Sequence, residues 1–158
     1  MHDLRVLQPD ALLKREAAAD ILRVNRTTAP AGLILSQSQV IALVSARDRA
    51  LNGTGRVELG GGVVEKLILA FYDSPFFQPD QAVETFEGLL EIFYYLKNET
   101  FDSIGDSDLI AFLREHFDGE CKGSLELLQG VSLDRLVRRI HGAVQQDEAA
   151  PWEEEEDE

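Results

Sequence analysis

Three consecutive glycines, Gly60, Gly61 and Gly62, stand directly before a predicted helix and could bind an anion. Backbone N–H groups at the start of a helix attract negative charge, and glycine lets a phosphate or carboxylate approach closely. The segment has neither the G-x-G-x-x-G nor the G-x-x-x-x-G-K-[ST] spacing of nucleotide-binding loops, and Glu58 would repel a bound anion. The simpler interpretation is that the glycines permit positive φ angles at a tight crossing before a buried helix.

A second group of chemically capable side chains lies between His116 and Ser124 and includes Asp118 and Cys121. Imidazole and thiolate are ligands that zinc prefers, and a cysteine beside a histidine can act as a nucleophile. A structural zinc site takes about four protein ligands, however, and Cys121 is the sole cysteine of the chain. We therefore assign no metal, no cofactor and no catalytic residue, and favour a turn between helices with a buried thiol.

The adjacent tyrosines Tyr94 and Tyr95 follow Phe93 in a predicted helix. Neighbouring helical positions are separated by about 100°, so these three side chains cannot all face one core. At least one tyrosine should therefore be exposed, and tyrosine is enriched at protein interfaces. The pair indicates a protein-binding surface; the alternative is a tyrosine whose hydroxyl reaches water at the edge of the core.

Residues 147–158 hold eight acidic side chains and no basic ones, against a net charge of −14 for the whole chain. This composition is typical of a disordered tail, and the lone Trp152 within it could anchor a partner. Arg135, Arg138 and Arg139 lie just upstream and could contact the tail or offer a partner the opposite charge. Nucleic-acid binding depends on cationic side chains, so the acidity of the chain argues against a nucleic-acid partner.

The elements that must position these residues are predicted to be six or seven helices, because apolar residues recur mostly at helical spacing. We expect an all-α fold, packed as an irregular or orthogonal bundle. Helices are predicted to begin near Pro9, Ser36, Gly62, Asp80, Asp106, Ser124 and Ser132. The first apolar stripe consists of Leu13, Ala17, Ile21 and Val24. Ser36 and Gln39 have the spacing of a capping box. Residues 33–35 and 56–59 could form at most a minor two-stranded ribbon.

The length of 158 residues fits one domain, which we place at residues 1–146, followed by the acidic tail at 147–158. A single cysteine excludes an internal disulfide and fits a reducing compartment. The N-terminus lacks the regions of a signal peptide, and the apolar stretch at 63–72 is too short to span a membrane. We expect a cytoplasmic protein with no membrane association, whose oligomeric state the sequence does not define.

Several separated motifs resemble those of one protein family. They include GRVELGGG at 55–62, FYY at 93–95, KNE at 97–99, FDGEC at 117–121 and GSLE at 123–126. Together they resemble a family of uncharacterised bacterial proteins of about this length, mostly from Gram-positive anaerobes, known as a domain of unknown function. The resemblance covers residues 33–140 and implies a bacterial, cytoplasmic, single-domain protein. It transfers no reaction, cofactor or catalytic residue.

Two functional hypotheses follow. The first is a non-catalytic helical module that binds another protein, through exposed tyrosine and the charged C-terminal region. The second is a protein, or an enzyme, that binds a small ligand or anion with the glycine loop and the turn at 118–124. The second hypothesis requires a pocket that joins these two segments. A nucleic-acid role through the three arginines ranks third.

Overall fold

The computed structural model describes residues 9–52, 54 and 60–156. In chain order its elements are α2 (Pro9–Leu22), α3 (Asn25–Thr28), the 3-10 turn η1 (Ala29–Ala31), α4 (Gln37–Leu51), α5 (Gly62–Phe71), η2 (Pro79–Gln81), α6 (Ala82–Glu99), α7 (Asp106–Asp118) and α8 (Leu125–Glu156). No strand occurs in these ranges, and the all-α prediction is confirmed. Within them, no helix is both long and apolar enough to span a membrane.

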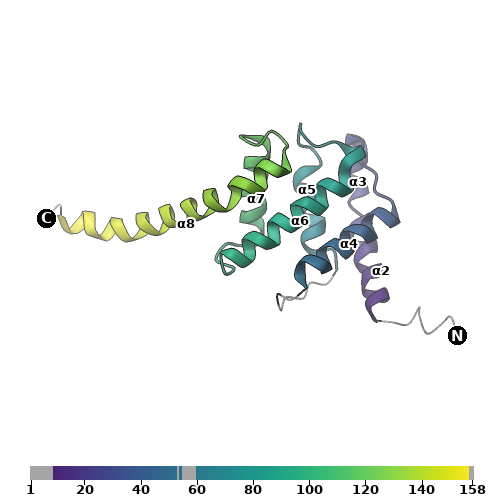
Figure 1. The fold of residues 1–158 in the computed structure, drawn as a ribbon, viewed down its shortest axis with the longest axis horizontal. Coiled ribbons are helices and arrows are strands. Elements are labelled where there is room, and N and C mark those ends of the chain that lie inside the picture. Colours follow the sequence, from purple (N-terminus) through teal and green to yellow (C-terminus); the bar gives the residue numbers. More distant parts are fainter. Residues whose placement is uncertain (1–8, 53, 55–59, 157–158) are drawn as a thin grey trace.

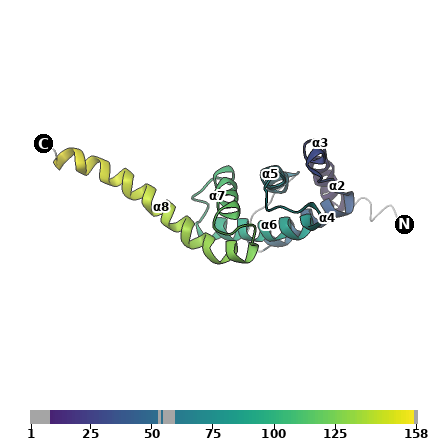
Figure 2. The same ribbon diagram turned by 90° about the horizontal axis from the view of Figure 1, so that it is seen from above.

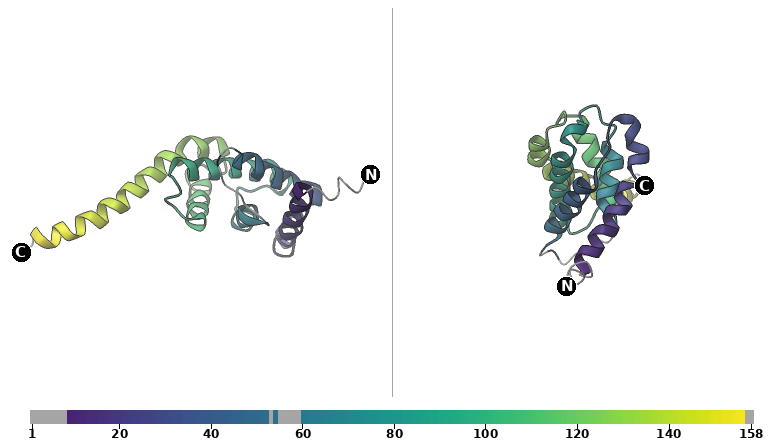
Figure 3. Two further views of the ribbon diagram at one scale, coloured as in Figure 1. Left: turned by 90° about the horizontal axis from the view of Figure 1, so that it is seen from below. Right: turned by 90° about the vertical axis from the view of Figure 1, so that its right-hand side faces the viewer.

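The helices form two crossed layers. Helices α4, α6 and α8 follow one another along one side of the molecule, and α2, α5 and α7 project from them as three prongs (Figures 2 and 3). Contacts join α4 to α6 and α6 to α8 within one layer, and α2 to α5 and α5 to α7 within the other. Helix α2 and the far end of α8 lie on opposite sides of the molecule, and α8 leads away from the body (Figure 1).

Local sequence explains where several helices begin. The Ser36 hydroxyl accepts a hydrogen bond from the Gln39 backbone N–H at 3.2 Å, and the Gln39 side chain accepts from the Ser36 N–H at 2.9 Å. This is the predicted capping box, which satisfies two donors that a helix start leaves free. Ser124 likewise accepts from the backbone N–H of Leu127 at 3.2 Å, at the start of α8.

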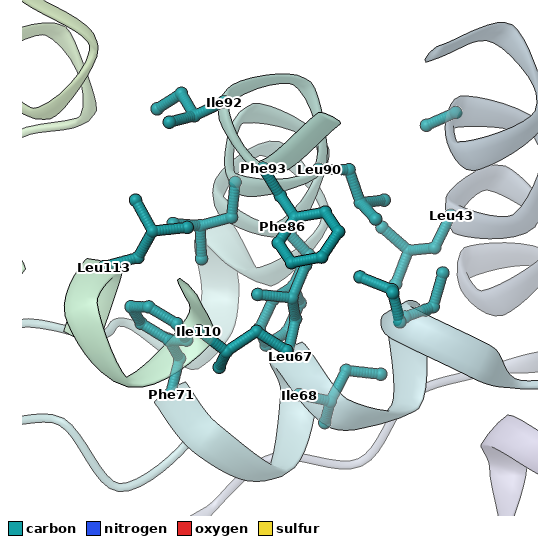
Figure 4. Packing of buried hydrophobic residues seen from close by; sticks show 14 of the residues in the cluster. Leu43, Leu67, Ile68, Phe71, Phe86, Leu90, Ile92, Phe93, Ile110 and Leu113 are labelled. Atoms are coloured by element: carbon teal, nitrogen blue, oxygen red, sulfur yellow. The ribbon is translucent and has the colours of Figure 1, made fainter. Parts of the chain in front are cut away.

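Helix α5 lies at the centre of the core, as its largely apolar circumference predicts. Its buried side chains are Val63, Val64, Leu67, Ile68 and Phe71. Leu67 and Phe71 point into the cluster that includes Phe86 of α6 and Ile110 of α7 (Figure 4). Phe71 also meets Phe117 edge to face, with 5.2 Å between ring centroids. Because α5 contacts α2, α4, α6 and α7, it joins both layers and both halves of the chain.

The predicted ribbon does not form at residues 33–35, which are an extended link between η1 and α4. A side chain takes the place of a partner strand there: Asn25 donates to the Leu35 carbonyl and accepts from the Leu35 N–H, both at 2.9 Å. The Thr28 hydroxyl donates to the Leu33 carbonyl at 2.7 Å. The second proposed strand, residues 56–59, lies outside the described residues.

Helix α7 begins at Asp106, as predicted, with Gly105 at the cap position and no side-chain cap bond. One predicted boundary nearer the C-terminus is wrong. The separate helices expected from Ser124 and Ser132 are a single helix, α8. Leu128, Ser132 and Leu136 are all fully buried on one face of it. Tertiary packing of that face outweighs the weak helix propensity of Gly130.

The two ends of the described chain also differ from expectation. Leu13, placed in the first apolar stripe, is 43% exposed, whereas Ala17, Ile21 and Val24 of the same stripe are buried. The backbone of α8 continues as helix to Glu156, where the composition predicted disorder from residue 147. Alanine, glutamine and glutamate are good helix formers, so loss of apolar periodicity at residue 146 does not require the helix to end there.

Candidate functional site

The glycine loop is held by a buried arginine of α4. Arg47 is 3% exposed, and its Nη1 donates to the Gly60 carbonyl at 2.7 Å. Gly60 has a φ of 66°, which only glycine adopts without cost. A Cβ on Gly61 would lie 2.6 Å from the Glu65 carboxylate. These contacts match the structural interpretation of the loop. Glu58 lies outside the described residues.

The turn at residues 118–124 is tied to the end of α5 by Asp118. This carboxylate accepts from the Ser74 hydroxyl at 2.6 Å and from Arg114 Nε at 2.5 Å. Arg114 also donates through Nη1 to the Ala70 carbonyl at 2.5 Å and to the Asp73 carboxylate at 2.8 Å. One arginine therefore links α7 to the last turn of α5 and to the residue that follows it. Asp118 is committed to this link.

The structure does not bring the glycine loop and the turn together. Gly61 caps the first turn of α5, whereas Asp118 is connected through Arg114 to Ala70 in the last turn. The helix between them has ten residues, a length of about 15 Å at about 1.5 Å per residue. The pocket that the ligand-binding hypothesis requires would have to join opposite ends of α5.

Cys121 is a buried thiol rather than a presented nucleophile. It is 1% exposed, and burial, with a further contribution from the negative charge of Glu120, raises its pKa. His116 turns to Glu120, with 2.8 Å between Nδ1 and Oε1, and lies against the Phe112 ring at 4.5 Å. No group of three or more His, Cys, Asp or Glu side chains suited to a metal ion occurs in the described part of the chain.

One of the two tyrosines is buried and the other is exposed, as the helical spacing predicts. Tyr94 is 3% exposed and meets Phe93 edge to face, with 5.0 Å between centroids. Tyr95 is 43% exposed. Of the pair, Tyr95 is the one whose ring another protein could contact.

The three arginines of α8 are engaged with nearby carboxylates. Arg135 pairs with Glu120 at 3.2 Å, and Arg138 pairs with Asp134 at 3.3 Å. Arg139 pairs with Glu115 at 2.9 Å. The Arg139 guanidinium also lies 5.0 Å from the centre of the Phe112 ring. Hydrogen bonds from Arg139 and Arg135 lower the pKa of Glu115 and Glu120 respectively. The expected basic patch is therefore largely neutralised within the fold.

Trp152 lies where only the backbone is described.

A groove between α5 and α7 is the surface feature that the sequence interpretation missed. Its volume is about 660 Å³, and it is lined by Lys66, Leu69 and Ala70 of α5 and by Ser107, Ile110, Ala111, Arg114 and Glu115 of α7. The lining between the charged rims is apolar, and Leu69 is 40% exposed. The one available signal was the apolar circumference of α5, which needs cover on every side.

Comparison with known proteins identifies a family but no activity. The sequence model of a family described as a family of unknown function (DUF6323) matches residues 20–146. No curated protein and no solved structure matches the chain. The resemblance seen in the motifs is confirmed at the level of the family.

Proposed function

The chain belongs to this family of unknown function, and we propose that it is a non-catalytic helical module that binds another protein in the α5–α7 groove. The supporting observation is the groove itself. It is mainly apolar, has a volume of about 660 Å³, and leaves Leu69 40% exposed on one wall. Leu69 and Ala111 come from helices that are otherwise well packed. Helical partners bind in grooves of this kind through apolar side chains that repeat along one face.

The rims of the groove suit a protein ligand. Lys66 stands exposed on the α5 side, and Arg114 and Glu115 stand on the α7 side. Arg114 is held in place by Asp73, Asp118 and the Ala70 carbonyl, so this end of the groove keeps its shape without a partner. A preformed site loses less conformational entropy on binding than one that has to be ordered.

The side chains that could perform chemistry are occupied in ways that favour this proposal over catalysis. Asp118 is held between Ser74 and Arg114. Cys121 is buried with a raised pKa, which disfavours the reactive thiolate. The histidine nearest to it in the sequence, His116, contacts Glu120. None of these three groups is aimed into the α5–α7 groove.

The small-ligand alternative is less well supported. It depends on Gly60, Gly61 and Gly62 acting together with the turn at 118–124, and these segments lie at opposite ends of α5. The groove is lined by neither of them. A nucleic-acid role ranks lower still, because Arg135, Arg138 and Arg139 each pair with a carboxylate. We propose the cytoplasm as the setting, since the sole cysteine needs no oxidising compartment.

The test is a matched pair of substitutions at exposed alanines. Ala111→Glu adds bulk and charge inside the groove, whereas Ala19→Glu makes the same change on α2, outside it. Both proteins should unfold near the wild-type temperature, because surface substitutions of this kind change stability by about 0.5 kcal/mol or less. Affinity purification from native-host extracts should recover a protein with wild type and Ala19→Glu, and should lose it with Ala111→Glu.

A third arm, Tyr95→Ala, locates the site. Loss of the partner with this variant alone would move the binding surface from the groove to α6. The proposal is contradicted if wild type, Ala111→Glu and Tyr95→Ala all recover the same proteins in equal amounts.

A further inference from the structure

Phe101, in the loop between α6 and α7, is displayed to solvent in an unusual way. It is 91% exposed, more than any other large apolar side chain in the described part of the chain. Its φ is 53°, and Asp102 follows with a φ of 59°. The left-handed region is uncommon for any residue with a Cβ and is an outlier for a bulky one. At 91% exposure, the ring gains little stabilisation from burial within the described part of the chain.

The loop that displays Phe101 is firmly built. Lys97 is 7% exposed; its Nζ donates to the Ile104 carbonyl at 2.9 Å and pairs with Asp106 at 2.8 Å. The backbone N–H of Asp102 donates to the Lys97 carbonyl at 3.0 Å. These bonds fix both sides of the loop, so the phenyl ring is held out by a defined backbone.

The segment that carries Phe101 is acidic. Residues 97–108 contain four carboxylates and one lysine, and that lysine pairs with two of the carboxylates, Asp102 and Asp106. Glu99 and Asp108 are exposed on either side of Phe101 in the sequence. The loop therefore presents an aromatic side chain on an acidic segment. A surface that matches it would be apolar, with a cation at its rim.

The α5–α7 groove of the same protein has these properties. Leu69, Ala70, Ile110 and Ala111 give it an apolar interior, and the cation of Lys66 stands at its edge. The other two charged groups of the rim are paired within the fold: Arg114 with Asp73 and Asp118, and Glu115 with Arg139. Phe101 does not fill its own groove, because it is 91% exposed. The same chain thus carries an exposed aromatic side chain and an exposed apolar groove.

We propose that the protein forms a symmetric dimer in which Phe101 of each copy inserts into the α5–α7 groove of the other. This inference rests on the proposed function, since it names a second copy as the protein that the groove receives. Two identical contacts related by a two-fold axis close the assembly at two subunits. The acidic loop of each copy then meets Lys66 of the other copy.

The first experiment measures the mass of the full chain by sedimentation equilibrium. Wild type should be a dimer that dissociates on dilution, and Phe101→Asn and Ala111→Glu should each weaken association at least about tenfold. Leu127→Asn and Ala19→Glu are matched controls, which change an exposed leucine and an exposed alanine elsewhere. Both controls should remain dimeric. Asn accepts positive φ more readily than Phe, so Phe101→Asn should unfold at or above the wild-type temperature at concentrations low enough that both proteins are monomeric.

Mixing the two defective proteins provides the second experiment. Phe101→Asn keeps an intact groove, and Ala111→Glu keeps Phe101. Phe101 of the second variant can therefore insert into the groove of the first, which forms one of the two contacts. Native mass spectrometry should show a mixed dimer where each variant alone is monomeric. A monomeric wild type, or a dimer that survives both substitutions, would overturn the proposal.

The outcomes separate this inference from the proposed function. If wild type is monomeric but Ala111→Glu loses a different protein, the groove binds proteins and the dimer is wrong. If Ala111→Glu changes neither self-association nor any other binding, both ideas fail.

Discussion

Ser132 places a hydroxyl inside the protein without a hydrogen-bond partner in the described ranges. It is 0% exposed and lies between the buried Leu128 and Leu136 on the inner face of α8. Burying a hydroxyl without a partner costs about 1–3 kcal/mol in proteins. The substitution Ser132→Ala removes that cost, and alanine also gains a few tenths of a kcal/mol in helix propensity. The small void left by the oxygen offsets part of the gain.

We expect Ser132→Ala to stabilise the fold by about 1–2 kcal/mol. For a chain of this size the unfolding temperature rises by about 2–4 °C per kcal/mol, so the midpoint should increase by about 2–8 °C. Urea denaturation followed by circular dichroism gives the free energy of unfolding directly. The result is distinctive because most single substitutions destabilise.

Ser45→Ala is the matched control, since Ser45 is a half-exposed serine inside α4. It reports the gain in helix propensity alone. If Ser132→Ala is no more stable than Ser45→Ala, or is less stable than wild type, the hydroxyl has a partner and the reasoning fails. Leu136→Ala, on the same face, should instead destabilise by about 2–5 kcal/mol.

Three further predictions concern the candidate sites. Tyr94→Ala should cost about 3–5 kcal/mol in urea unfolding, whereas Tyr95→Ala should cost less than about 1 kcal/mol; similar losses would contradict their assigned burial. The folded-state pKa of Glu120 lies below its ordinary value of 4.5. Its stabilisation is therefore complete above that value and is lost as the pH falls through the folded pKa. Glu120→Gln should accordingly reduce the loss of stability below about pH 4.5, and an unchanged acid profile would refute this. Cys121 should react with a thiol reagent at least roughly tenfold more slowly in the native protein than in urea, and equal rates would show it is accessible.

The sequence predicted those parts of the fold that depend on local rules. Ser36 and Gln39 are three residues apart, and that spacing alone defines the capping box that the structure contains. Two adjacent tyrosines on a helix cannot both face one core, and Tyr94 is buried while Tyr95 is exposed. Cys121 was expected to be a buried thiol, and it is 1% exposed.

Features set by tertiary contacts were beyond such rules. The groove exists because α7 covers one side of α5 and leaves Leu69 partly exposed, and no local pattern specifies which side stays open. The pairing of Arg135 with Glu120 joins residues 15 positions apart, so the arginines looked free in the sequence. Separate helices were predicted from Ser124 and Ser132, because the packing of Leu128 and Leu136 against the other helices could not be seen in the sequence.

The central place of α5 determines how the molecule acquires its structure. The helix has ten residues, and isolated helices of fewer than about 12–15 residues are marginal in water. Its stability must come from α2 and α4 before it in the chain and from α6 and α7 after it. Neither half can therefore become native while the other is unfolded, and folding should be a single cooperative event. The slowest-exchanging amide protons should include those of α5, and a chain shortened to end before α7 should not protect them.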